Sequence, residues 1–166
     1  MSIATTDLCD QFENDIHAGL IHVLPPVFQS FGQAQAFYGQ AVTFKVFEDN
    51  SLIKKALEND NGAGKVMIVD GGASVRCALV GGSIALAGTN NGWAGIVVDG
   101  CVRDTGEINE LNIGVRALAA MPLRSLKKGA GERDLGVHIQ GVCVNPGDWI
   151  YVDADGIVVS PKALHE

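Results

Sequence analysis

Three glycine-rich segments carry residues that could bind a small anion. They are Asp70-Gly71-Gly72, Gly81-Gly82-Ser83 and the run from Gly100 to Asp104, which ends in Arg103-Asp104. Paired glycines before a helix expose backbone N–H groups to an anion, and α/β proteins bind ligands at the carboxyl ends of their strands. The Arg103 guanidinium is a planar fork for a carboxylate, and the Asp104 carboxylate suits a divalent cation. A carboxylate-bearing metabolite, held by loop amides, Arg103 and a metal on Asp104, would explain all three segments together.

Each of these features also has a purely structural interpretation. Neighbouring opposite charges, as at Arg103 and Asp104, usually lie on a solvated surface. Gly71-Gly72 fits a tight turn, and the carboxylates of Asp70 and Asp99 fit residues that cap loops. Both interpretations of the three segments stay open at this point.

Common catalytic motifs are absent from the sequence. Residues 62–65 resemble a phosphate-binding loop, but Val66 stands where that loop carries Ser or Thr, so the segment is typical of a turn. There is no G-x-S-x-G nucleophile elbow. None of the four histidines pairs with another at the spacing of metal ligands, and the four cysteines form no C-x-x-C pair.

The charge balance limits the expected partners. With 12 Lys+Arg against 19 Asp+Glu, the net charge is −7, which argues against nucleic acid because phosphate needs a basic surface. The one basic cluster, residues 124–128 with Arg133, lacks interleaved aromatic residues and is predicted to be a solvated loop. The longest apolar run, residues 117–121, is far shorter than the ~20 residues of a membrane helix. No secretory signal follows Met1, so we expect a cytoplasmic protein with reduced cysteines.

Hydrophobic periodicity predicts the elements that must position these residues. A helix is expected from a cap at Thr5-Thr6-Asp7 to about Gly19, followed by an irregular docking segment over residues 20–38. Asn50 is predicted to cap a short helix, and Ser83 a second one that reaches Asn91-Gly92. A third short helix is expected near residues 107–112. Strands are predicted at residues 41–47, 65–69, 95–98, 137–144, 149–152 and 157–160, and residues 115–121 form a further apolar stretch.

The order of these elements predicts the fold class. The strand–helix–strand order over residues 65–98 indicates a βαβ unit, and the last third of the chain indicates an antiparallel β extension. We therefore expect a single α/β domain over residues 1–166, with a central sheet flanked by helices.

Five co-linear segments resemble a known family and cover nearly the whole chain. They are Thr43–Ser51 (TFKVFEDNS), Val69–Leu79 (VDGGASVRCAL), Asn91–Asp104 (NGWAGIVVDGCVRD), Ile113–Leu118 (IGVRAL) and Asp148–Gly156 (DWIYVDADG). In these segments the chain resembles the regulator of ribonuclease E activity proteins, which are related to the class II, metal-dependent 4-hydroxy-4-methyl-2-oxoglutarate aldolases.

The resemblance implies a fold, an assembly and a site. The fold is a swivelling β/β/α-type domain, and the assembly is a ring-shaped homotrimer, or a dimer of trimers, with active sites near subunit boundaries. In the aldolases the arginine matching Arg103 binds substrate and the aspartate matching Asp104 coordinates the metal, commonly Mg²⁺ or Mn²⁺, which makes these two the implied catalytic residues. The implied substrate-binding residues are Gly81, Gly82, Ser83, Ile84 and Arg103. The implied reaction is retro-aldol cleavage to two pyruvate units, with oxaloacetate decarboxylation as a related activity, and both pass through a pyruvate enolate.

One departure from the aldolases concerns Gly82. The aldolases carry an aspartate 21 positions before the arginine, where it helps to organise the water shell of the metal, and here that position is Gly82. The longer aldolases also supply an acidic residue from a C-terminal extension, for which this chain has no clear match.

Two hypotheses follow. One is a divalent-metal lyase acting on a small 2-oxo acid with a second carboxylate. The other is an acidic interaction module that binds and inhibits a ribonuclease, or binds an RNA helicase. Methyl transfer to a quinone is a weaker third interpretation, because no G-x-G-x-x-G segment supports it.

Overall fold

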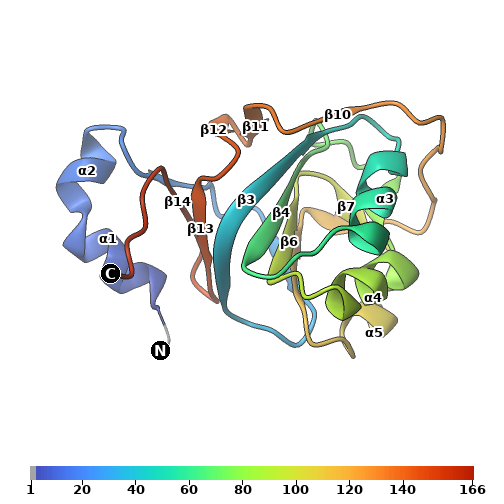
Figure 1. Cartoon of the computed structure of the whole chain (residues 1–166), viewed down its shortest axis with the longest axis horizontal. Helices are drawn as coiled ribbons and strands as arrows, with labels where there is room; N and C mark the ends of the chain where they lie inside the picture. The colour runs from blue at the N-terminus through green and yellow to red at the C-terminus, as the bar shows by residue number, and fades with distance from the viewer. Residues whose placement is uncertain (1–2) are drawn as a thin grey trace.

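A curled mixed sheet runs through the molecule, as seen in the computed structural model, which describes residues 3–166 (Figure 1). The strand order is β1-β14-β13-β3-β4-β6-β8-β2, and β10 pairs with β3 to complete nine strands. The middle pairs β3–β4, β4–β6 and β6–β8 are parallel, whereas the outer pairs are antiparallel. A small parallel sheet (β5-β7-β9) and a hairpin (β11-β12) stand apart from the main sheet.

The elements have the following bounds. The helices are α1 (Thr5–Gln11), α2 (Glu13–His17), α3 (Ser51–Asn59), α4 (Gly82–Asn90) and α5 (Thr105–Ile108). The strands are β1 (His22–Val23), β2 (Gln29–Phe31), β3 (Phe37–Lys45), β4 (Lys65–Asp70), β5 (Ala78–Val80), β6 (Gly95–Val98), β7 (Cys101–Val102), β8 (Gly114–Ala117), β9 (Ala119–Ala120), β10 (Glu132–Arg133), β11 (Val137–Ile139), β12 (Val142–Val144), β13 (Trp149–Val152) and β14 (Ile157–Ser160). None of the helices in this described part of the chain is long and apolar enough to cross a membrane.

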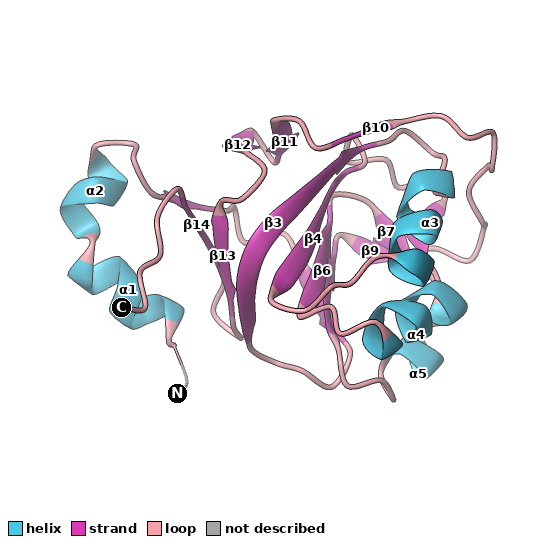
Figure 2. Ribbon diagram, viewed as in Figure 1, coloured by secondary structure: helices cyan, strands magenta, loops and turns pink. Residues whose placement is uncertain are grey.

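Both faces of the sheet are buried, which explains the continuous apolar run of β4. Met67 and Val69 point into a core shared with α3, α4 and α5. Val66 and Ile68, the alternate residues, point into a second core beneath the β11-β12 hairpin, β13 and β14. Figure 2 shows the three helices together on one side of the sheet, with α1 and α2 beyond β13 and β14.

The α/β domain predicted from the sequence is confirmed, and so is its βαβ unit. β4 and β6 are parallel neighbours, and α4 lies between them in the chain. The predicted strands at residues 95–98, 149–152 and 157–160 have the observed bounds of β6, β13 and β14.

Two predicted elements are each divided in two. The N-terminal helix breaks at Phe12, where φ is −111° and ψ is 25°, and Leu8, Phe12 and Ile16 still pack in one cluster against β13 and β14. The strand expected at residues 137–144 is a hairpin. Gln140 and Gly141 both have positive φ (50° and 81°), which is the backbone of a tight two-residue turn.

Candidate functional site

Two short parallel strands bring the main sequence-predicted segments together. β5 pairs with β7, and the Arg103 amide continues this ladder by donating to the Val80 carbonyl at 2.9 Å. Gly81 and Arg103 therefore leave the same edge of the small sheet side by side. Neither strand was predicted from the sequence, because each is only two or three residues long and such short apolar runs carry no periodicity.

The carboxylate of Asp104 is tied to the first residue of α4. Its Oδ2 accepts a hydrogen bond from the Gly82 amide at 3.0 Å. Asp104 adopts the left-handed conformation (φ 56°, ψ 43°), which is uncommon outside glycine and recurs at functional sites. The predicted cap by Ser83 is wrong: α4 already begins at Gly82, its N-cap is Gly81, and no side chain of that residue caps it. Asp104 caps this helix from a distant part of the chain.

A hollow of about 60 Å³, which we call the strand-end hollow, lies beside this contact. Four cationic side chains line it with a single carboxylate, that of Asp104, although the chain as a whole has a net charge of −7. The lining residues are Asn50, Lys54, Ala78, Gly81, Ser83, Ile84, Arg103, Asp104, Arg124 and Lys127. The hollow therefore has the chemistry of a site for a small polyanion.

Two residues of the basic cluster lie at the strand-end hollow, which was not predicted from the sequence. Residues 124–128 were predicted to be a solvated loop, and Arg124 and Lys127 are indeed exposed. Both nevertheless line the strand-end hollow, because Leu126 pairs with Asp49 and the Ala78 amide donates to the Leu123 carbonyl at 2.7 Å. No local pattern could reveal this, since the contacts join residues 45 to 77 positions apart.

Asp49 fixes the basic segment, residues 124–128, to the start of α3. Its Oδ2 accepts hydrogen bonds from the amides of Lys128 (2.7 Å) and Ala130 (3.2 Å), and its Oδ1 accepts from the amide and hydroxyl of Ser51. Burial alone would raise the pKa of this carboxyl, but the four hydrogen bonds outweigh burial and lower the pKa to about 2. Asp49 thus stays ionised and holds the segment that carries Lys127.

Asn50 is the N-cap residue of α3, as the sequence predicted, but its side chain makes no capping hydrogen bond. Its Nδ2 donates to the Leu79 carbonyl at 3.0 Å, which ties α3 to β5 beneath the strand-end hollow. The capping hydrogen bond is supplied instead by Asp49, which bonds the Ser51 amide. The buried Oδ1 of Asn50 has no hydrogen-bond partner among residues 3–166, although the residue itself lines the hollow.

The first glycine-rich segment does not join this site. Asp70 Oδ1 accepts from the Gly72 amide at 3.0 Å, and its Oδ2 accepts from the His138 amide at 3.2 Å. Asp99 accepts from the side-chain amide of Gln140 at 2.7 Å. The structural interpretation is therefore right for Asp70 and Asp99, whose carboxylates organise turns and hold the β11-β12 hairpin. The prediction that all three segments bind one ligand is wrong for residues 70–72.

The residues at the strand-end hollow fit a hydrated hard cation. Within residues 3–166, no three His, Cys, Asp or Glu side chains gather into a group that could enclose a metal ion. Mg²⁺ needs no such cage, because it keeps several waters and binds through one or two carboxylates together with substrate oxygens. Asp104 is exposed, and its Oδ1 accepts no hydrogen bond from the described residues, so this oxygen is available to a cation.

The cysteines do not supply a nucleophile to the hollow. All four are free thiols, and Cys77 and Cys101 are buried. Burial raises the pKa of both, which keeps them protonated and unreactive at neutral pH.

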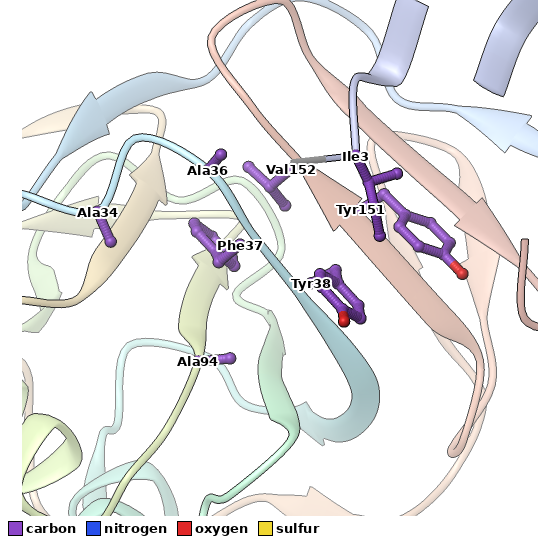
Figure 3. A pocket seen from close by; sticks show the side chains of 8 residues that line it. All are labelled: Ile3, Ala34, Ala36, Phe37, Tyr38, Ala94, Tyr151 and Val152. Carbon is purple, nitrogen blue, oxygen red and sulfur yellow. The ribbon is translucent and has the colours of Figure 1, made fainter. Parts of the chain in front are cut away.

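A larger hollow, of about 480 Å³, lies against β3 and β13 (Figure 3). Figure 3 shows the rings of Tyr38 and Tyr151 beside aliphatic side chains, and none of the described residues that line this space is charged. None of the sequence-predicted site residues reaches it. The chemistry of its lining, rather than its volume, makes it a weaker candidate than the strand-end hollow.

The fold and the site together define a class of protein: a single α/β domain with a curled mixed sheet, and a polar site at the carboxyl ends of parallel strands. Residues 5–159 match the RraA-like family model, which is described as Aldolase/RraA. The chain belongs to the RraA-like family.

Similar proteins carry three different names. A protein of Burkholderia mallei, 57% identical over 166 residues and matched along the full length of both chains, bears the provisional name 4-hydroxy-4-methyl-2-oxoglutarate aldolase. The structure of the RNA-processing inhibitor RraA from Thermus thermophilus is 44% identical with a TM-score of 0.90, over 100% of this chain and 99% of that one. A Geobacillus kaustophilus structure described as an S-adenosylmethionine: 2-dimethylmenaquinone methyltransferase is 42% identical with a TM-score of 0.91, over 98% and 97%.

Proposed function

We propose that this protein is a divalent-metal-dependent lyase that acts on small 2-oxo acids carrying a second carboxylate. Its substrates are 4-hydroxy-4-methyl-2-oxoglutarate, cleaved to two pyruvate units, and oxaloacetate, decarboxylated to pyruvate. One observation carries the proposal: Arg103 and Asp104 lie beside the start of α4, at a hollow whose other charged side chains are all cationic. The aldolase name of the Burkholderia relative supports the same reaction class.

The carboxylate next to the oxo group would be held by Arg103 and the first turn of α4. The Gly82 amide is engaged by Asp104, but the first amides of a helix have no intrahelical partner, which leaves Ser83 and Ile84 free to donate. Arg103 makes no ion pair with the described residues, so its fork remains open for an anion.

The second carboxylate would lie toward Lys54, Arg124 and Lys127. These three side chains come from α3 and the basic segment and also line the strand-end hollow. Two separate anchors at the ends of a short dianion fix the bond that breaks relative to Asp104, and such positioning lowers the barrier.

In both reactions a carbon–carbon bond breaks and its electron pair moves toward the 2-oxo group, giving a pyruvate enolate that is then protonated. For the retro-aldol reaction the hydroxyl proton is lost and a second pyruvate leaves, and for oxaloacetate the leaving group is CO₂. Mg²⁺ or Mn²⁺ bound at Asp104 would act as a Lewis acid toward the oxo group. Asp104 would hold the metal ion beside Arg103.

The test is pyruvate release by the purified full chain with Mg²⁺ or Mn²⁺, measured with a coupled lactate dehydrogenase assay. Asp104→Ala should lower kcat by about 10²–10³-fold, the usual cost of losing one electrostatic stabiliser. Asp10→Ala, a change to an exposed aspartate in α1, is the matched control and should turn over like the wild type. Undiminished turnover by Asp104→Ala would contradict the metal role.

A second function is favoured by the match to the RNA-processing inhibitor from Thermus thermophilus. On this alternative, the acidic protein binds a basic face of a ribonuclease or an RNA helicase without turning over any substrate. The net charge of −7 predicts binding that weakens steeply with salt. Co-purification at low ionic strength tests it, and absence of a complex with either class of enzyme would contradict it.

We further propose a cytoplasmic homotrimer, or a dimer of such trimers. Leu123, just before the basic segment, and Leu126, within it, have exposed fractions of 59% and 57%, and burial of these side chains against another copy would stabilise an assembly. The four free thiols suit a reducing compartment. Light scattering should give the trimer mass, and a stable monomer would contradict the assembly.

A further inference from the structure

The carboxylate of Glu107 occupies the space in which a side chain at position 82 would lie. A Cβ built on Gly82 would overlap Glu107 Oε2, and it would stand 3.1 Å from both Cβ and Cδ of the same glutamate. The family resemblance predicts an aspartate at position 82. In this chain a carboxylate is therefore present beside that position, but it comes from α5 instead of α4.

Local geometry aims Glu107 at this place. The left-handed Asp104 reverses the chain, and the single turn of α5 then puts residues 104 and 107, three positions apart, on the same side. Ile108 is fully buried and anchors the opposite side of α5 in the core. The packing of α5 thus places the backbone of Glu107 beside Gly82.

Glu107 and Asp104 approach the same glycine from different directions. Asp104 Oδ2 bonds the Gly82 amide, whereas Glu107 lies where the Cβ of residue 82 would be. With backbone bonds of about 1.5 Å, the two carboxylates are no more than about 8 Å apart. A cation on Asp104 with one layer of water reaches across about 7 Å, which lies within this upper limit, and Mg²⁺ usually keeps several of its waters.

The carboxylate of Glu107 has no other task in the structure. It is exposed and makes no hydrogen bond or ion pair with any side chain or amide of residues 3–166. A carboxylate beside a candidate cation site is attracted by a positive charge bound there.

We propose that Glu107 is the second carboxylate of this site, which accepts hydrogen bonds from the water shell of a divalent cation held by Asp104. Its carboxylate takes the place of the aspartate that the aldolases carry where this chain has Gly82, and Glu107 acts as a positioning residue. This inference rests on the cation site of the proposed function. The inference also implies that Gly82→Asp alone brings no gain in activity, because the new side chain would compete with Glu107 for one space.

Titration of the metal-free full chain with Mn²⁺, followed by the electron paramagnetic resonance signal of free Mn²⁺, tests the inference without substrate. Glu107→Gln should weaken Mn²⁺ binding by about 10–100-fold, the usual effect of losing a residue that orients metal-bound groups. Glu107→Asp should recover part of the affinity. Glu110→Gln, a change to an exposed glutamate just beyond α5, is the matched control and should bind Mn²⁺ like the wild type.

Moving the carboxylate from α5 to α4 distinguishes a role in cation binding from a role that only stabilises α4. The double variant Glu107→Ala with Gly82→Asp returns the carboxylate from the α4 side and should bind Mn²⁺ more tightly than Glu107→Ala alone. If Glu107→Gln lowers the metal-free Tm but keeps wild-type Mn²⁺ affinity, the residue only stabilises the helix and the inference is wrong. It is also wrong if the wild type binds no Mn²⁺. A wild type that binds Mn²⁺ yet releases no pyruvate would overturn the proposed lyase activity and leave the role of Glu107 intact.

Discussion

Replacing Asp49 by asparagine would show how firmly the basic segment is held beside the strand-end hollow. The amide has the shape of the carboxyl group, but one of its two ends is an NH₂ donor that would face the amides of Lys128 or Ser51. Hydrogen bonds from four donors lower the pKa of Asp49 from 3.8 to about 2, against the opposing effect of burial. A pKa lowered by this amount corresponds to about 2 kcal/mol of folding free energy at neutral pH.

The sign of the pH dependence follows from the direction of that change. Because the folded-state pKa lies below the unfolded value, the stabilisation is complete above pH 3.8 and is lost as the pH falls toward 2. Asp49→Asn resembles the protonated carboxyl at every pH. The stability difference between the two proteins should therefore be about 2 kcal/mol at pH 6 and fall by about 1 kcal/mol at pH 3.

Urea unfolding at pH 6 and pH 3 measures this difference, and thermal unfolding at pH 6 should show a Tm lower by about 4–8 °C for a domain of this size. Asp10→Asn, at an exposed position, controls for the general effect of removing a negative charge. Loosening of the segment should also raise KM for the oxo acid more than it lowers kcat. A stability difference that is equal at both pH values would refute the reasoning, because it would mean that the charge of Asp49 is not what holds the segment.

Three further changes test other contacts. Arg124→Ala should raise KM for oxaloacetate by about tenfold, and by less at high salt, because it removes one of the cationic side chains at the hollow. Steady-state kinetics at two ionic strengths measure this change, and an unchanged KM would count against a second anion anchor. Gly95→Ala should destabilise the fold by about 1–3 kcal/mol in urea unfolding, since the added Cβ would overlap the ring of Phe37; a variant as stable as the wild type would contradict this packing. Tyr151→Phe should cost about 1–3 kcal/mol, because its hydroxyl accepts from the buried Leu164 amide at 2.7 Å; hydrogen exchange at Leu164 should accelerate, and unaltered protection would show that the bond contributes little.

The sequence predicted well those features that depend on neighbouring residues. Alternation and apolar runs located β4, β6, β13 and β14, because a strand buried on one or both faces must show its burial in its own composition. The pair Arg103-Asp104 was recognised from residue chemistry, and the structure places both at one hollow. The sequence was weaker where a single backbone conformation decides the outcome, as at the tight turn of Gln140-Gly141.

What the sequence by itself determined, then, is the α/β class and the family, and its residue chemistry singled out the two residues proposed to hold a small acid and a cation. Only the tertiary structure decided which distant groups join them. The pairing of β5 with β7 sets Gly81 beside Arg103, and Asp49 brings Lys127 to the same hollow. The packing of α5 sets Glu107 against Gly82. The physical reason is that each of these contacts depends on how separate elements pack in three dimensions, whereas the residue pattern of any one segment reports only which of its own faces is buried.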